Sequence, residues 1–167
     1  MQNIISLIVS DFKNNVLKIF FMLFMHRILF YLYSKMDRMY FYVLCTPIII
    51  LYKVYTEFLL NCEISFKTKI GKNIIIHHGQ SLIINKNTVI GDNVILRHST
   101  TIGNKSQNPL ESPILGNNVE IGSNCVILGN ILIDDNVIIG AGSVVVKNIQ
   151  KNSIVAGNPA IFIKKRI

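Results

Sequence analysis

The sequence predicts a mainly β fold, a parallel β-helix built of three-sided turns, preceded by a short helical region. Two observations predict the solenoid. Aliphatic side chains recur at every sixth position through the second half of the chain, and a small or branched residue follows each four positions later. Six fits neither the helical period of about 3.6 nor the strand period of two, whereas stacked solenoid turns repeat at a fixed interval. The six-residue positions are Ile84, Ile90, Leu96, Ile102, Leu115, Ile121, Ile127, Ile133, Ile139 and Val145, and their followers are Thr88, Val94, Thr100, Val119, Cys125, Ile131, Val137 and Ser143.

Polar triplets between these positions supply the corners of the turns. Gly-Asp-Asn at 91–93, Gly-Asn-Asn at 116–118 and Gly-Ser-Asn at 122–124 are residue types that tolerate a left-handed backbone. Three hexads make one turn, so the stretch from about residue 70 to 160 supplies roughly five turns, at a strand separation of ~4.8 Å. Antiparallel hairpins with Asn-Gly turns are the alternative, but hairpin spacing does not stay at a constant six.

The first sixty residues have a different composition. They contain two runs rich in large apolar and aromatic side chains, at 16–33 and 39–60. Lys18, His26 and Arg27 interrupt the first run, and the second contains Pro47. Neither uninterrupted run reaches the roughly 18 to 20 residues of a bilayer crossing. We therefore expect two helices that pack on each other and on the solenoid or a second copy, and peripheral membrane contact stays open for such a basic, aromatic-rich region.

Composition narrows the class of protein. The chain has 167 residues, half of them apolar, and a net charge of +8. Its basic residues are dispersed without an aromatic stacking platform, which argues against nucleic-acid binding. Three cysteines, an odd number without metal-ligand spacing, and no evident signal peptide favour a reducing, cytoplasmic location. We expect a helical region at 1–62, the β-helix at 63–160 and a basic C-terminal tail at 161–167.

The chemistry is expected where the repeat is broken. The count slips by two between Ile76 and Ile84, so the chain must bulge around the His77-His78-Gly79-Gln80-Ser81 segment. An extended loop at 103–113, GNKSQNPLESP, is rich in Gly, Asn, Ser and Pro. Insertions into a solenoid map to one face, which commonly binds ligands.

The residues around these breaks resemble a known family. IHHGQSLIINKNTVIG at 76–91, RHSTTIGNK at 97–105 and the stretch from GAGSVVVKNI to AGNPA at 140–160 are similar to hexapeptide-repeat acyltransferases of the serine acetyltransferase type. Within that group they most resemble the acetyltransferases of colanic acid and capsular polysaccharide gene clusters. The resemblance implies a left-handed β-helix, a homotrimer with active sites between subunits, and acetyl-coenzyme A as the donor, without a metal.

Site residues follow from the resemblance position by position. His78 matches the catalytic histidine, a general base for the acceptor hydroxyl, and Glu63 matches the carboxylate that orients it, with Glu57 as a second candidate. His77 is expected to shape the site. Ser112 replaces a loop histidine that belongs to the amino-acid site of serine acetyltransferases, and His98 and Arg97 are candidates for binding the acceptor, with a solvent-facing corner histidine as the alternative for His98.

Coenzyme A binding in this family is mostly through the backbone. The resemblance places the pantetheine arm along the nearly side-chain-free segment Gly140, Ala141, Gly142 and Ser143, and the nucleotide end near Gly157 and Asn158. Lys147, Lys164 and Lys165 are candidates for the phosphates, although a solvated surface charge explains each lysine as well.

The favoured function is acetyl transfer from acetyl-coenzyme A to a sugar hydroxyl in surface polysaccharide biosynthesis, by direct attack on the thioester. Acetylation of L-serine for cysteine synthesis is the enzymatic alternative, and a non-catalytic scaffold is the alternative of another class. A metal-dependent lyase on a similar prism needs three histidines across an interface, a spacing that His77, His78 and His98 do not show.

Overall fold

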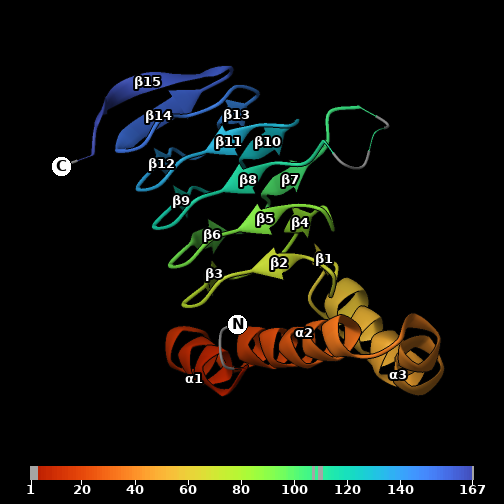
Figure 1. Ribbon diagram of the computed structural model, residues 1–167. Helices are drawn as coiled ribbons and strands as arrows, with labels where there is room; N and C mark the ends of the chain where they lie inside the picture. The colour runs from red at the N-terminus through yellow and green to blue at the C-terminus, as the bar shows by residue number, and fades with distance from the viewer. Residues whose placement is uncertain (1–3, 107, 109–110, 167) are drawn as a thin grey trace.

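The computed structural model describes residues 4–106, 108 and 111–166. A helical base precedes a prism of short strands (Figure 1). The base comprises α1 (Ile4–Asn14), α2 (Leu17–Lys35), α3 (Arg38–Lys53) and the π-helix η1 (Val54–Leu59). The strands are β1 (Glu63–Ile64), β2 (Lys69–Ile70), β3 (Ile75–His77), β4 (Ile83–Ile84), β5 (Val89–Ile90), β6 (Ile95–Arg97), β7 (Thr101–Gly103), β8 (Ile114–Leu115), β9 (Glu120–Ile121), β10 (Val126–Leu128), β11 (Leu132–Ile133), β12 (Ile138–Ile139), β13 (Val144–Val145), β14 (Ser153–Gly157) and β15 (Ala160–Lys165).

Strands β1 to β14 pair in parallel between neighbouring turns, which gives the prism three faces. Sheet A has the order β1-β4-β7-β10-β13, sheet B β2-β5-β8-β11, and sheet C β3-β6-β9-β12-β14-β15. Strands β1 to β12 make four complete turns, and β13, a bridge from Ile133 to Ile149, and β14 add a partial fifth. The parallel β-helix predicted from the six-residue period is therefore confirmed.

The core fills the inside of the prism with the side chains of the repeat and continues into the helical base, where Leu23, Leu29 and Phe41 are fully buried. Every six-residue position from Ile84 to Val145 and every follower from Thr88 to Ser143 is buried. Corner asparagines take the left-handed backbone, with φ between 54° and 59° at Asn73, Asn93, Asn118, Asn124, Asn136 and Asn152. The local pattern alone predicts the fold because buried parallel strands require aliphatic side chains and the corners require residues, such as asparagine and glycine, that tolerate a left-handed backbone.

Both breaks of the repeat leave the prism intact. Ile76 pairs with Leu96 and Ile84 pairs with Ile102, so eight residues in one turn span the corner that six span in the next. The extra residues form a bulge in which His78, Gly79 and Ser81 have positive φ. The second break lies between the end of β7 at Gly103 and the start of β8 at Ile114, where a loop stands out from the prism (Figure 1).

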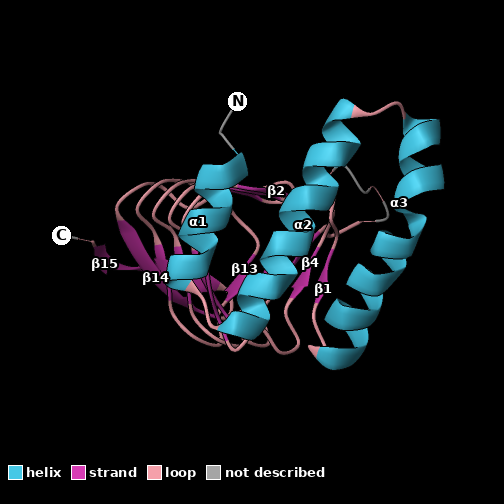
Figure 2. Cartoon of the chain, turned by 90° about the horizontal axis from the view of Figure 1, so that it is seen from below, coloured by secondary structure: helices cyan, strands magenta, loops and turns pink. Residues whose placement is uncertain are grey.

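The helical base closes the open hydrogen-bonding edge of the first turn, one side chain for each sheet (Figure 2). Arg27 donates to the carbonyls of Ile70 and Gly71 at the end of β2. Asn15 donates to Ile74 O and accepts from Ile76 N, over 2.8 and 2.9 Å, beside β3. The Tyr52 hydroxyl donates to the carbonyl of Ile64 in β1 over 2.7 Å. An exposed strand edge would otherwise pair with other chains, so the base protects the solenoid.

The helices depart from the sequence prediction in number and length. The pattern predicts two helices, and the structure adds α1; Pro47 lies inside α3 rather than ending it. The helices at Leu17–Lys35 and Arg38–Leu59 have 19 and 22 residues and are long and apolar enough to cross a membrane by length and composition. The expectation that both runs are too short is therefore wrong, because the helices continue through charged residues such as Arg27 in α2 and Lys53 at the end of α3. Such helices alone are weak evidence for a crossing, and α2 buries one face on the solenoid.

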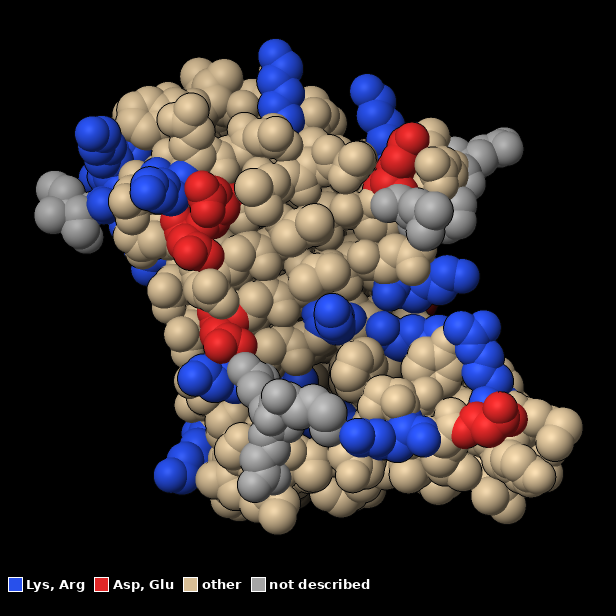
Figure 3. Space-filling view, viewed as in Figure 1, with Lys and Arg blue, Asp and Glu red and all other residues tan. Residues whose placement is uncertain are grey.

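The C-terminal end also differs from the expected tail. Residues 160–165 form β15, which pairs antiparallel with β14 at the edge of sheet C, and Lys164 lies opposite Ile154. On the face shown in Figure 3, Lys and Arg side chains are scattered over the prism and the base. That distribution agrees with the dispersed charge of the sequence.

Candidate functional site

Several of the expected site residues, from distant parts of the chain, gather on one edge of the prism, where each turn passes from sheet C to sheet A. We call it the C–A edge, formed by residues 77–82, 98–100, 122–125 and 140–143. Backbone hydrogen bonds connect these corners in order: Ser99 N to Gln80 O, Asn124 N to His98 O and Gly142 N to Ser123 O, over 2.8, 3.2 and 2.8 Å. The edge therefore carries His78 and His98 on its first two turns and the Gly140–Ser143 segment on its fourth.

His78 projects from the bulge on this edge. Its backbone φ is 69° and its side chain is exposed. The ring lies edge-on to that of His98 in the next turn, with 5.9 Å between the centroids. Behind it, Gly79 has a φ of 67°, and a Cβ there would lie 2.8 Å from Cδ1 of Ile19 in α2. Gly79 thus lets the bulge pack on the helical base, and the base positions His78.

Glu63 lies on β1, one turn below β4, close to the bulge in the fold. Its backbone N donates to Leu82 O over 2.8 Å, and it pairs with Ile83, five residues beyond His78. Its carboxylate is exposed, and among the residues the structure describes no hydrogen bond joins it to His78. The fold brings the predicted pair to neighbouring turns on the same side of the prism and leaves their direct contact unmade in the single chain.

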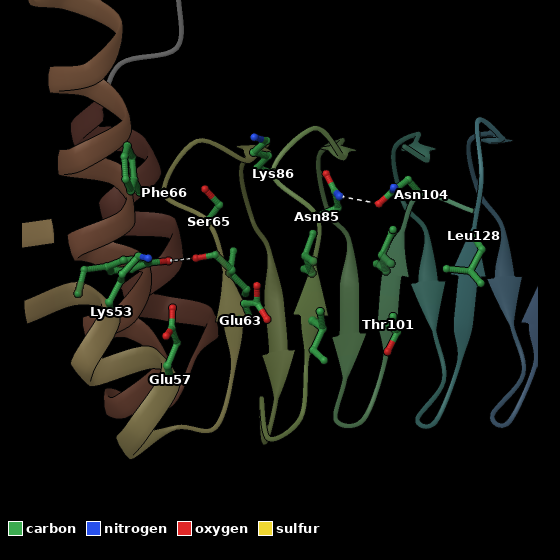
Figure 4. Close-up of a pocket in the computed structure, with 16 residues that line it drawn as sticks. Lys53, Glu57, Glu63, Ser65, Phe66, Asn85, Lys86, Thr101, Asn104 and Leu128 are labelled. Carbon is green, nitrogen blue, oxygen red and sulfur yellow. Dashed lines mark hydrogen bonds between the residues drawn. The ribbon is translucent and has the colours of Figure 1, made fainter. Parts of the chain in front are cut away.

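A cavity of about 470 Å³ lies over sheet A beside Glu63 (Figure 4). Helical residues Lys53 and Glu57 line one side, and Asn85 and Asn104 line the other, joined by a hydrogen bond of 2.9 Å. Carboxylate, amide and ammonium groups over an apolar floor suit a ligand with several hydroxyl groups. The further lining residues are Tyr52, Ile64, Ser65, Phe66, Ile83, Ile84, Lys86, Thr101, Ile102, Gly103 and Leu128.

The polar residues of this cavity were missed by sequence reasoning, apart from Glu57 and Glu63. Asn85 and Asn104 occupy corner positions, where the repeat contains asparagine throughout, so nothing in the pattern separates them from structural corners. Lys53 belongs to an apolar run whose orientation only the packing of α3 decides.

Ser112 lies at the end of the extended loop and is buried. Its hydroxyl is 3.2 Å from Oδ1 of Asn85 and so connects the loop to the cavity wall. Three residues of this loop, 107, 109 and 110, lie outside the described residues.

His77 and Arg97 occupy the outer face of sheet C rather than the cavity. They lie opposite each other in β3 and β6, and Arg97 forms an ion pair with Glu120 over 3.3 Å. The structure therefore places them beside the C–A edge, where a role in shaping the site stays a prediction.

The four residues expected along the pantetheine arm differ in what they can offer a ligand. Gly142 has a φ of 71°, and a Cβ there meets nothing within 4 Å, so its backbone is open. Gly140 is small for another reason, because a Cβ would lie 2.9 Å from that of Ala156. Ser143 is buried; its hydroxyl donates to Gly140 O over 2.5 Å and accepts from Gly157 N over 3.2 Å. The exposed positions at this corner are Ala141 and Gly142.

The remaining cofactor candidates separate into two places. Gly157 and Asn158, both exposed, follow β14 close to Ser143 and so stay near the C–A edge. Lys147 lies beyond β13, at the corner from sheet A to sheet B, where it lines a cavity of about 380 Å³ with Pro159 and Phe162. The structure does not bring Lys147 to the C–A edge.

Cys62 and Cys125 are unsuited to nucleophilic chemistry. Burial raises the pKa of the Cys62 thiol to about 12, with a further contribution from the charge of Glu63. Burial also raises the pKa of Cys125, which lies inside the prism at 0% exposure. Because the thiolate is the nucleophile, both groups stay inert near neutral pH.

Comparison with known proteins agrees with the fold. Residues 112–147 match the family described as bacterial transferase hexapeptide (six repeats). The chain is 43% identical over 114 residues to WcaB of Escherichia coli K12, which is named as a colanic acid biosynthesis acetyltransferase, and the match covers 68% of this chain and 70% of that protein. It is 37% identical over 111 residues to a serine acetyltransferase of Staphylococcus aureus Mu50, covering 66% of this chain and 52% of the relative.

Solved structures give the same answer. A serine acetyltransferase of Brucella abortus strain S19, in complex with coenzyme A, superposes with a TM-score of 0.78 at 26% identity, over 97% of this chain and 66% of that one. The chain thus spans between half and two thirds of the length of these serine acetyltransferases. On the six-residue repeat, the prism and the extent of the match to WcaB, the chain belongs to the hexapeptide-repeat family of bacterial acetyltransferases.

Proposed function

We propose that the protein is an acetyl-coenzyme A-dependent O-acetyltransferase that modifies a sugar hydroxyl in surface polysaccharide biosynthesis. The observation that carries the proposal is the C–A edge, where an exposed imidazole, His78, and a backbone-lined corner, Ala141-Gly142, lie on one line of the prism. A base and an open groove for an extended donor are what acyl transfer to a hydroxyl requires.

In the proposed reaction, neutral His78 accepts the proton of the acceptor hydroxyl as its oxygen attacks the thioester carbonyl. The new C–O bond forms, the C–S bond breaks, and the leaving sulfur takes the proton from the imidazolium, which restores the base. Glu63 accepts from the other ring nitrogen and so sets the tautomer, and Glu57, further along the cavity, is the alternative for that role. No covalent enzyme intermediate is needed, in agreement with the inert cysteines.

The donor is proposed to lie along the C–A edge, with its pantetheine arm on Ala141 and Gly142 and its nucleotide end near Gly157 and Asn158. The Brucella relative whose structure contains coenzyme A supports this donor. In this family-based proposal the chain forms a homotrimer in the cytoplasm, where a neighbouring prism covers the exposed His78 and closes the site. The histidine and the donor would then be shielded from water.

A sugar acceptor is favoured over L-serine for two reasons. Ser112 stands where the loop histidine of serine acetyltransferases is expected, and the identity to WcaB exceeds that to the staphylococcal serine acetyltransferase, 43% against 37%. The cavity over sheet A, with Glu63, Asn85 and Asn104, offers several hydrogen-bonding groups to a polyhydroxyl acceptor.

Thiol release from acetyl-coenzyme A, followed with purified protein and either nucleotide-sugar acceptors or L-serine, tests this function. We expect turnover with a sugar, and a loss of about 10² to 10⁴ in rate for His78→Ala, with a much smaller loss for His77→Ala, since His77 is proposed to shape the site and not to transfer the proton. Robust turnover on serine would show that serine acetylation is the function. An unchanged rate in His78→Ala would refute the mechanism, and the absence of transfer together with retained partner binding would favour a scaffold.

A further inference from the structure

Helix α1 buries a charged residue, Asp11, while it leaves three apolar side chains in solvent, and its other apolar residues, Ile4, Leu7 and Ile8, are partly buried. Ser10 accepts from Asn73 N, Asn15 bonds to the first turn of the prism, and Asp11 is fully buried. A helix on the surface of a soluble domain normally turns its apolar stripe inward. The apolar residues of α1 that remain exposed are Ile5, Val9 and Phe12.

The exposed apolar surface continues without a break across the base. Phe12 of α1 contacts Phe20 of α2 with 5.1 Å between the ring centroids, and Phe21 of α2 contacts Tyr55 of η1 at 5.7 Å. In Figure 2, which views the molecule from below, helices α1 and α2 lie side by side across the end of the prism and α3 lies beside α2. We name this surface the outer helical face and define it by Ile5, Val9, Phe12, Leu17, Phe21 and Phe58, which are 47% to 81% exposed.

Helix α3 extends the same property beyond the prism. A narrow stripe of it is buried, marked by Phe41, Cys45 and Tyr52. On its other sides Val43 and Leu44 are 71% and 63% exposed. A helix that is apolar on all sides is stable only when an apolar environment surrounds it.

The charged residues of the helical base indicate which apolar environment this is. On the helical base five exposed cations, Lys13, Lys18, Lys35, Arg38 and Lys53, outnumber the exposed anions Asp37 and Glu57. Apolar side chains bordered by cations match the acyl and headgroup layers of an anionic bilayer. A second copy would instead bring like charges together, which opposes self-association through this face.

The contacts of α2 with the prism indicate whether the helical base lies on a membrane or crosses it. Ile19 and Arg27 are buried, with Ile19 against Gly79 and Arg27 on the first turn. The helix cannot enter the bilayer core lengthwise without breaking these contacts. We infer that the outer helical face seats the protein in the interfacial plane of an anionic lipid membrane, with the prism rising from it. This inference does not depend on the proposed function.

Tryptophan fluorescence tests the proposed membrane contact directly, because the chain contains no tryptophan and an introduced one is the only reporter. Phe12→Trp places a single reporter in the face, and Phe162→Trp places one at the far end of the prism, where Phe162 is 58% exposed against 62% for Phe12. With vesicles of phosphatidylglycerol and phosphatidylcholine, we expect a blue shift and quenching by lipids brominated on the acyl chain for Phe12→Trp alone. Equal responses of the two reporters, or none, would overturn the inference.

Vesicle cosedimentation of the full chain provides the second measurement. Removing two apolar groups in Phe12→Ser/Phe21→Ser should lower partitioning by about tenfold or more, and Lys13→Gln/Lys18→Gln should lower it severalfold on anionic vesicles only. The matched control Ile161→Ser/Phe162→Ser should bind like the wild type, and circular dichroism confirms that all variants are folded. Absence of vesicle binding would exclude the membrane as the partner of this face. If the wild type shows instead a doubled oligomer mass that Phe12→Ser/Phe21→Ser abolishes, the face would belong to an interface with a second copy.

Discussion

His26 should make the stability of this protein depend on pH below neutrality. The side chain is 1% exposed on α2, stacked against Phe30 with 6.2 Å between the rings. Burial, aided by the charge of Arg27, lowers the pKa of His26 from 6.5 to about 3. The folded state therefore holds the ring neutral, whereas the unfolded chain protonates it with its ordinary pKa.

The sign and size of the effect follow from proton linkage. A lowered folded-state pKa contributes stability that is fully present above pH 6.5 and is lost as the pH falls from 6.5 towards 3. One proton is worth about 1.4 kcal/mol per pH unit, so the loss attributable to His26 at about pH 5 is about 2 kcal/mol. Exposed carboxylates add their own pH dependence, but they do so equally in a variant that lacks only this ring.

Urea unfolding followed by circular dichroism, at about pH 8 and about pH 5 and at one protein concentration, measures the difference. The concentration is held constant because assembly would shift apparent stability. We expect His26→Phe to lose about 2 kcal/mol less than the wild type between the two values, whereas the exposed control His77→Phe should behave like the wild type. Equal losses in His26→Phe and the wild type would refute the reasoning.

Three other substitutions test how the base, the bulge and the loop are held. Gly79→Ala should lower the free energy of unfolding by about 1 to 2 kcal/mol, because the φ of 67° at this position is left-handed, and should slow acetyl transfer by displacing the bulge. Adding Ile19→Val should relieve the contact with the new Cβ. An unchanged melting temperature and an unchanged rate in Gly79→Ala would contradict this account. Arg27→Met leaves Asp11 buried without its partner and should cost about 3 to 5 kcal/mol in urea unfolding, most of which Arg27→Met/Asp11→Leu should recover; a double variant no more stable than the single one would count against a buried-charge penalty. Ser112→Ala removes a hydrogen bond worth about 1 kcal/mol and should raise the KM for the acceptor severalfold while that for acetyl-coenzyme A stays constant; an equal rise in both would place Ser112 outside the acceptor site.

The architecture could be predicted because its determinants are local and repeated. Each hexad by itself predicts that one side chain points inward, as those of Leu96 and Ile139 do. It also predicts that a corner residue such as Asn93 takes a left-handed backbone. The same count located the bulge at His78 and the loop after Gly103, since any insertion interrupts a constant period. The number of complete turns was slightly overestimated because the last turn forms only a bridge at Ile149 on sheet B.

Tertiary structure decided which residues share an edge and which helix faces are covered. The alignment of His78, His98 and Gly142 on the C–A edge depends on hydrogen bonds between residues 19 or more positions apart, and the separation of Lys147 from them depends on the same stacking. The sequence by itself determined the period, the inward side chains and the family resemblance. Only the folded chain placed Asn15, just after α1, against the first turn and left Phe12 of α1 exposed, because the orientation of a helix is set by contacts with distant partners rather than by its own pattern.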